Sequence, residues 1–203
     1  MENQEHIKEI IKRTFGALQD VYNTQKEGFN HNPEGKQSRL IFPRYSKNYR
    51  KGETRLSEQE LRFIFVEQFN KYCEEKGLPW FFSVETPTEY KYIFSDKGKK
   101  IKPRQDVNGQ SAMVDLAIHD ENLKRIALIE FKALNPDQDC FTKDFVKLAE
   151  EPVVLSFFVM YVKAYDNGTI NSLKSKIGAK DAKTIFVCYD LKTGKQIENK
   201  ILS

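Results

Sequence analysis

The sequence contains few cysteines, and they do not form the patterns that stabilise small proteins. The three, Cys73, Cys140 and Cys188, lie far apart, without a CxxC pair or a cysteine–histidine cluster. This argues against a disulfide framework and a structural zinc site, and it favours a reducing compartment. The first residues lack the apolar stretch of a signal peptide, and the longest nearly apolar run, Val153 to Val162, has about half the length of a membrane span. We therefore expect a cytoplasmic protein without a membrane anchor.

A strong excess of charge of one sign is also missing. Lys and Arg number 33 against 29 Asp and Glu, so the formal net charge is +4. This is too small for a histone-like or basic-tail protein, although it allows a basic face. Aromatic residues make up 12% of the chain, which argues against disorder. The length of 203 residues and the apolar fraction of 39% fit one domain with a single core.

Hydrophobic periodicity divides the chain into predicted helices and strands. Helices are predicted at 5–23, at 57–77 behind a capping box of Ser57 and Glu60, at 140–151, and more weakly at 169–177. Strands are predicted at 40–42, 80–86, 90–94, 111–119, 125–133, 153–162 and 184–189. The strands at 111–119 and 125–133 have the pattern of a β-hairpin.

This order of elements predicts an α/β fold with a mixed central β-sheet flanked by helices on both faces. We expect a single domain over residues 1–203. Residues 1–55 are predicted to form an N-terminal helical extension with a basic loop, and residues 56–203 are predicted to form the core.

Three charged residues interrupt the apolar strands of the predicted hairpin. Asp115 lies in the first strand, and Glu130 and Lys132 lie in the second. Side chains alternate along a strand, so Glu130 and Lys132 share one face, and hairpin pairing allows Asp115 to share it. Burying an unpaired charge is costly, so such residues are kept mainly where they pair or bind a metal. Two carboxylates beside a lysine form a hard oxygen site suited to Mg²⁺ or Mn²⁺.

The spacing of these residues resembles the PD-(D/E)XK, or restriction-endonuclease-like, nuclease superfamily. The similarity consists of Asp115, fourteen intervening residues and then Glu130-Phe131-Lys132, and it extends over residues 57–163 in the order helix, strand, hairpin and helix. Val114 stands before Asp115 where the motif has proline. The resemblance implies a restriction-endonuclease-like core, metal ligation by Asp115, Glu130 and the carbonyl of Phe131, and hydrolysis of phosphodiester bonds.

The tripeptide Glu-x-Lys alone decides nothing, because it occurs five times in the chain. Only Glu130 lies in an apolar strand that has an aspartate on a partner strand. A purely structural reading stays open, in which Asp115 and Lys132 form an ion pair and Glu130 faces solvent at a strand end.

Further residues are candidates for supporting roles. Members of the superfamily often bring an acidic residue from the first helix toward the metal; the resemblance gives this role to Glu60, although the capping box also explains that residue. Glu67 fits a solvated helix charge. The resemblance lets Lys147 face the phosphate, but an i, i+3 pair with Asp144 explains it as well. His119 fits the rim of the hairpin better than a metal ligand, and no serine or cysteine pairs with a histidine as nucleophilic catalysis requires.

Two loops rich in Lys and Arg are predicted at residues 36–55 and 97–104. Such residues contact phosphates without regard to base sequence, and aromatic residues among them can stack on unpaired bases. The candidates for nucleic-acid contacts are Arg44, Arg50, Lys51, Lys100, Lys102, Arg104 and Lys147.

The motif and the basic loops together predict a metal-dependent nuclease with Mg²⁺ or Mn²⁺ as cofactor and nucleic acid, DNA before RNA, as substrate. Asp115, Glu130, Lys132 and Glu60 are the candidate catalytic residues, and Asp115, Glu130 and Phe131 are the candidate metal ligands. The alternative is a nuclease-like module that binds nucleic acid or a partner without catalysis. A homodimer or a complex with defence or repair components stays open, and no membrane contact is expected.

Overall fold

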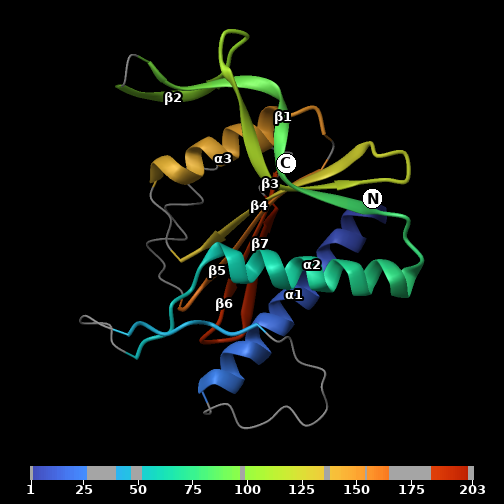
Figure 1. Ribbon diagram of the computed structural model, residues 1–203, viewed down its shortest axis with the longest axis vertical. Coiled ribbons are helices and arrows are strands. Elements are labelled where there is room, and N and C mark those ends of the chain that lie inside the picture. The colour runs from blue at the N-terminus through green and yellow to red at the C-terminus, as the bar shows by residue number, and fades with distance from the viewer. Residues whose placement is uncertain are drawn as a thin grey trace.

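The computed structural model describes residues 2–26, 40–46, 52–96, 99–134, 138–153, 155–164 and 184–200. Within these ranges the chain forms three helices and one seven-stranded sheet (Figure 1). The helices are α1 (Glu2–Lys26), α2 (Glu58–Lys76) and α3 (Gln138–Glu150). The strands are β1 (Phe81–Asp96), β2 (Lys99–Gln105), β3 (Gln110–His119), β4 (Arg125–Ala133), β5 (Leu155–Val162), β6 (Thr184–Asp190) and β7 (Lys195–Lys200). The predicted helix at 169–177 lies outside the described residues.

The sheet has the strand order β2-β1-β3-β4-β5-β6-β7. Strand β4 pairs in parallel with β5, and β5 with β6, whereas the other neighbouring strands are antiparallel. The chain passes from β4 to β5 through α3, as a parallel pair requires. The predicted α/β fold with a mixed sheet, including the hairpin of β3 and β4, is confirmed.

Alternating side chains of the sheet form two hydrophobic layers, one on each face. On β5, Phe157 and Val159 belong to the layer beneath α1 and α2, while Phe158 and Met160 belong to the layer beneath α3. All four are fully buried. Both faces of the central strands are therefore covered, which explains their nearly continuous apolar sequences.

Helix α1 is part of the main core. Its apolar stripe is buried against α2 and the sheet, and the ring of Phe15 stacks on Tyr189 of β6 at a centroid distance of 4.8 Å. On the outer side, Arg13 binds Glu75 of α2 at 2.6 Å. The helix that the sequence assigns to an extension thus shares the core of the domain.

Helix α2 begins and ends with the residues that the sequence predicts. Ser57 and Glu60 form the capping box, in which the Glu60 carboxylate accepts a hydrogen bond from the Ser57 amide at 2.7 Å. Gly77 ends the helix in the left-handed conformation, with φ of 62°, which glycine adopts without strain. The buried residues of α2 pack against β4, and its first turn thereby reaches the charged residues of that strand.

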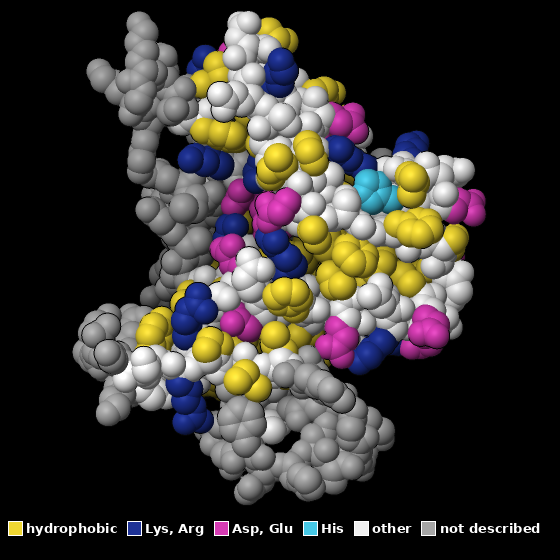
Figure 2. All heavy atoms as spheres, viewed as in Figure 1, with side chains coloured by type: hydrophobic (Ala, Val, Ile, Leu, Met, Phe, Trp, Pro, Cys, Tyr) yellow, Lys and Arg dark blue, Asp and Glu magenta, His cyan; other side chains and the backbone are white. Residues whose placement is uncertain are grey.

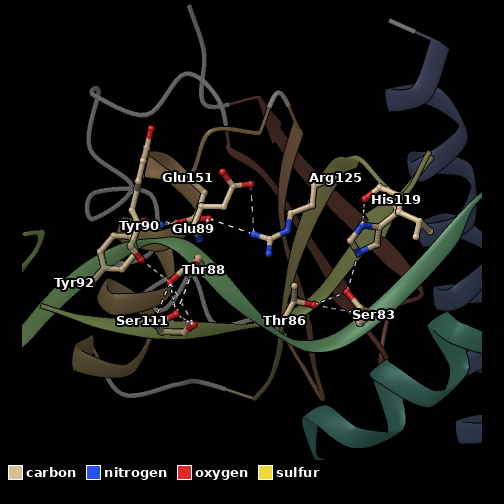
Figure 3. A network of polar contacts seen from close by, with 12 residues as sticks. Ser83, Thr86, Thr88, Glu89, Tyr90, Tyr92, Ser111, His119, Arg125 and Glu151 are labelled. Atoms are coloured by element: carbon tan, nitrogen blue, oxygen red, sulfur yellow. Dashed lines mark hydrogen bonds and ion pairs between the residues drawn. The ribbon is translucent and has the colours of Figure 1, made fainter. Parts of the chain in front are cut away.

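Strand β1 contains a bulge that polar side chains stabilise (Figure 3). Its register with β3 shifts between Pro87 and Lys91. Within this interval the Thr88 hydroxyl accepts a hydrogen bond from the amide of Ala112 at 2.9 Å and donates to the carbonyl of Tyr90 at 2.7 Å. Side-chain hydrogen bonds therefore replace backbone pairing where the ladder is interrupted.

Glu151, which directly follows α3, binds the same bulge from the other side. Its buried carboxylate accepts hydrogen bonds from the amides of Glu89 and Tyr90 at 2.8 and 3.0 Å and from the hydroxyl of Tyr92 at 2.9 Å. Arg125 of β4 lies 3.7 Å from it (Figure 3). This carboxylate joins the end of α3 to β1.

Several local predictions were wrong. The strands predicted at 80–86 and 90–94 are one strand, because pairing with β3 continues on both sides of the bulge. Most of the basic loop predicted at 97–104 is edge strand β2, a position where lysine and arginine are well tolerated. Residues 40–42 form no strand, although Arg44 makes an isolated bridge with Thr54. Strand β7 was not predicted, because its sequence, KQIENK, is polar.

The pairing of β1 with β3 also creates a serine–histidine contact that the sequence did not predict. His119 Nε2 lies 2.8 Å from the hydroxyl of Ser83, and its Nδ1 lies 3.1 Å from the carbonyl oxygen of Leu123 (Figure 3). The Ser83 hydroxyl also contacts that of Thr86 at 2.7 Å. His119 therefore stands at the rim of the hairpin turn, as expected, held there by a backbone carbonyl.

Candidate active site

Asp115 lies where β3 separates from β4. The ladder between the two strands begins at the pair Leu116–Ile129, and Asp115 is the adjacent residue on β3. Its side chain continues the connection, because one carboxylate oxygen accepts a hydrogen bond from the amide of Phe131 at 2.8 Å. The other oxygen lies 2.6 Å from the guanidinium of Arg62 on α2. Asp115 thus joins β3, β4 and α2 at one point.

Arg62 connects this point to β1. Its guanidinium also binds Glu85 at 2.7 Å, a residue whose φ of 46° lies in the left-handed region, where a residue other than glycine is strained. Burial lowers the pKa of Arg62, but Glu85 and Asp115 raise it by more. Within the described residues, the buried Nε of Arg62 has no hydrogen-bond partner.

Glu130 extends from β4 toward α3 and is only 2% exposed. The ammonium of Lys147 on α3 lies 2.5 Å from its carboxylate, 2.6 Å from the carbonyl oxygen of Met113 and 2.9 Å from Asp144. Burial raises the pKa of Glu130 well above its ordinary value, and the negative charge of Asp144 raises it further. The Lys147 ammonium opposes this shift but does not cancel it.

Lys132 shares the face of Glu130, as the strand period predicts. Its ammonium lies 3.0 Å from Asp144, 3.5 Å from Glu58 of α2 and 3.1 Å from the carbonyl oxygen of Phe131. Burial lowers the pKa of Lys132, but the surrounding carboxylates, with Asp144 and Glu130 foremost, raise it by more. Lys132 is therefore a charged, nearly buried ammonium, and Asp144 bridges it to Lys147.

Carboxylates outnumber cations in this cluster. The carboxylates are Glu58, Glu85, Asp115, Glu130 and Asp144, and the cations are Arg62, Lys132 and Lys147. With every group ionised, five negative charges face three positive ones, so two negative charges remain. Figure 2 shows acidic and basic side chains side by side above the N-terminal half of α2. The purely structural reading required Glu130 to face solvent, and its burial contradicts that reading.

The donor atoms at this point fit a hard divalent cation. The carboxylates of Asp115 and Glu130 and the carbonyl of Phe131 supply oxygen, and a carboxylate oxygen that accepts one hydrogen bond keeps a second lone pair. With every group ionised, the excess charge of the described residues in the cluster equals that of one such ion. Among the described residues, no three Asp, Glu, His or Cys side chains form a metal-binding group by themselves. This does not conflict with Mg²⁺, which usually takes one or two carboxylates and completes its shell with water and phosphate oxygens.

The acidic residues predicted on α2 lie in two different environments. The hydrogen bonds of Glu60 go to Ser57 and, at 3.5 Å, to the hydroxyl of Tyr161, so the structure places it in the capping box. Glu58, two residues earlier, is the carboxylate of α2 that reaches Lys132. Glu67 is paired with Lys71 at 2.6 Å on the helix surface, as expected for a solvated charge.

The residues predicted to contact nucleic acid are only partly described. Arg44 is exposed, and Arg104 is exposed and lies 3.5 Å from Asp106. Lys147 is buried against Glu130, which contradicts the expectation that it faces the phosphate in this conformation. Four further candidates lie outside the described part of the chain or have side chains outside it: Arg50, Lys51, Lys100 and Lys102.

The structure adds Glu58, Arg62 and Asp144 to the site. Asp144 could have been found from the sequence, because it falls on the inward stripe of α3, next to Phe145 and three residues from Lys147. Because Asp144 and Lys147 both lie on the inward stripe of α3, which covers Glu130, their charged groups require partners of opposite charge. The roles of Glu58 and Arg62 follow from the crossing of α2 over β3 and β4, which no local pattern encodes.

No known protein family, curated protein or solved structure matches this chain. Of the helices in the described ranges, none is both long enough and apolar enough to cross a membrane.

Proposed function

We propose that this protein is a metal-dependent nuclease that hydrolyses phosphodiester bonds, with DNA as the favoured substrate. The observation that carries the proposal is the charged cluster at the separation of β3 and β4. Two strand carboxylates, Asp115 and Glu130, a strand carbonyl and Lys132 lie together there, in a cluster where five carboxylates face three cations among the described residues. Burying carboxylates in excess of cations costs free energy, and a divalent cation offsets this cost most directly.

The topology supports a restriction-endonuclease-like core. After α2 the chain forms the antiparallel strands β1, β3 and β4, then α3, and then β5, which is parallel to β4. Strand β2 is an additional edge strand inserted between β1 and β3 in the sequence. This is the helix, strand, hairpin and helix order that the resemblance to the PD-(D/E)XK superfamily implies. The motif residues lie on β3 and β4, the two central strands of that unit.

The roles of the residues follow from their positions. Asp115, Glu130 and the Phe131 carbonyl would hold Mg²⁺ or Mn²⁺, and such an ion would supply activation of a water molecule and positive charge beside the phosphate. Lys132 supplies a fixed positive charge for the anion that develops during hydrolysis. Arg62 orients Asp115 through the 2.6 Å ion pair, and Asp144 orients Lys132 at 3.0 Å.

Exposed side chains near the cluster support a nucleic-acid substrate. Phe63, next to Arg62 in the sequence, is 63% exposed, and Val84, next to Glu85, and Met113, two residues before Asp115, are each 50% exposed. An exposed phenylalanine is suited to stacking on an unpaired base. Arg104 on edge strand β2 adds positive charge, which favours phosphate contacts that weaken with salt.

The proposal is tested by nicking of supercoiled plasmid and trimming of labelled single-stranded DNA, with Mg²⁺ or Mn²⁺ and with EDTA. We expect cleavage by the wild type that EDTA abolishes and that the double variant Asp115→Ala/Lys132→Ala lacks. The matched control is Glu67→Ala/Lys71→Ala, which removes an acid–base pair on the surface of α2. Activity that survives the Asp115/Lys132 double substitution contradicts the proposal.

A second candidate is a nuclease-like binding module without catalysis. One observation favours it: Arg62 and Lys147 already bind the carboxylates of Asp115 and Glu130. This candidate predicts salt-dependent DNA binding that needs no metal and is unchanged by Glu130→Ala. Under the nuclease proposal, the same substitution removes the dependence of DNA binding on Mg²⁺.

A further inference from the structure

The ammonium of Lys147 lies among three oxygen atoms that are suited to bind a cation. Its ammonium is surrounded by the carboxylates of Glu130 and Asp144 and the carbonyl of Met113, at 2.5, 2.9 and 2.6 Å. These oxygens come from three elements, β4, α3 and β3. The lysine side chain is 8% exposed, so water cannot readily replace any one contact.

A divalent cation bound by Glu130 competes with this ammonium. The carboxylate has two oxygens, but a divalent cation beside a lysine ammonium in a nearly dry site is strongly repelled. The Lys147 ammonium and a divalent cation therefore cannot readily occupy neighbouring positions at Glu130. Lysine has a flexible four-carbon stem, so its ammonium can move several ångströms without a change in the backbone.

We propose that Lys147 is an internal counterion that occupies the cation site and is displaced when a divalent metal binds to Glu130. The same displacement removes the Lys147 ammonium from Asp144, whose carboxylate would then be able to supply a further oxygen to the ion. The displaced ammonium moves toward solvent and becomes available to a phosphate oxygen. This inference rests on the proposed metal site, and it explains how a lysine that is buried here can also serve the substrate.

The electrostatics of the cluster make this exchange favourable. The Glu130 carboxylate is only 2% exposed and is paired with the single positive charge of the Lys147 ammonium. A divalent cation supplies twice the charge at the same place. Asp144 retains its ion pair with Lys132 at 3.0 Å, so the loss of Lys147 does not leave it without a cation.

The test is Mn²⁺ and Mg²⁺ binding by calorimetry to the full chain, as wild type, Lys147→Met and the control Lys143→Met. Lys143 lies one turn away on the same helix and is exposed. We expect Lys147→Met to bind the metal about tenfold to a hundredfold more tightly than wild type, because no charge-assisted hydrogen bond has to be broken first. Lys143→Met should bind as the wild type does.

Thermal unfolding gives an independent readout. Lys147→Met should melt lower than wild type without metal and recover with Mn²⁺. A permanent structural ion pair predicts the opposite, namely a loss that Mn²⁺ does not restore and an affinity that is equal or weaker. If Lys147→Met fails to fold, Lys147→Gln keeps two donors for the same oxygens without the charge, and it should also bind metal more tightly.

The outcomes separate the two proposals. If wild type binds Mn²⁺ and neither Lys147 variant binds it more tightly, the counterion role is wrong and the metal site stands. If neither wild type nor any Lys147 variant binds Mn²⁺ or Mg²⁺, the proposed metal site is wrong, and the counterion role falls with it.

Discussion

Replacing Glu151 with alanine should destabilise the protein more than any surface substitution. Its buried carboxylate accepts three hydrogen bonds, from two backbone amides of the β1 bulge and from the hydroxyl of Tyr92, at 2.8 to 3.0 Å. A hydrogen bond to a charged group contributes about 1.5–3 kcal/mol, and a buried donor left unsatisfied costs a similar amount. The contributions of the three hydrogen bonds are not additive, because water can enter the space that the side chain leaves. We therefore expect the free energy of unfolding to fall by about 3–5 kcal/mol.

The assay is urea unfolding followed by the fluorescence of Trp80, the one tryptophan in the sequence, and by circular dichroism. Glu151→Gln keeps the shape but turns an amide group toward the donors, so it should cost about half as much as the alanine variant. The control is Glu150→Ala, which removes an exposed carboxylate at the adjacent position. If Glu151→Ala costs less than about 1 kcal/mol, or no more than Glu150→Ala, the carboxylate does not hold the bulge.

Three further predictions concern single carboxylates. Glu60→Ala should lower the free energy of unfolding by about 1 kcal/mol through loss of the capping box, while calorimetric metal affinity stays unchanged; a fall in affinity would place Glu60 in the site. The hydrogen bond from Arg13 lowers the pKa of Glu75 to about 2. Its folded pKa is therefore below its unfolded value, and the stability difference between wild type and Glu75→Gln should be present above the ordinary pKa and vanish as pH falls toward 2. A difference in melting temperature that is the same at neutral and acidic pH would refute this. Glu85→Gly should change the free energy of unfolding by less than about 1 kcal/mol. Glycine removes the strain of the positive φ, and the ion pair with Arg62 that is lost contributes little because the Glu85 carboxylate is exposed. A loss above about 2 kcal/mol, measured by urea unfolding, would contradict this expectation.

Hydrophobic periodicity predicts those helices and strands well that bury one face or both faces. The stripe of α1, the capping box of α2 and the apolar hairpin of β3 and β4 all lie where the sequence places them. Strands β2 and β7 were missed because they are edge strands rich in charged and polar residues, whose pairing depends on a neighbour rather than on their own composition.

The site shows the same division between local and tertiary information. The strand period places Glu130 and Lys132 on one face, and Asp115 lies within one residue of the end of the β3–β4 ladder. The partners of these residues could not be predicted in the same way. Arg62 and Glu58 reach the strands because α2 crosses them, and Lys147 is buried because α3 covers β4. Such contacts depend on how helices pack on the sheet.

The most direct test of the central claim is to measure metal occupancy and plasmid nicking in the same samples. Mn²⁺ is titrated into wild type and Glu130→Gln, bound Mn²⁺ is followed by electron paramagnetic resonance, and nicking of supercoiled DNA is quantified at each point. The account predicts that nicking by the wild type rises with the bound Mn²⁺ and that Glu130→Gln loses both together. Nicking in EDTA, or nicking by Glu130→Gln at the wild-type rate, would contradict it.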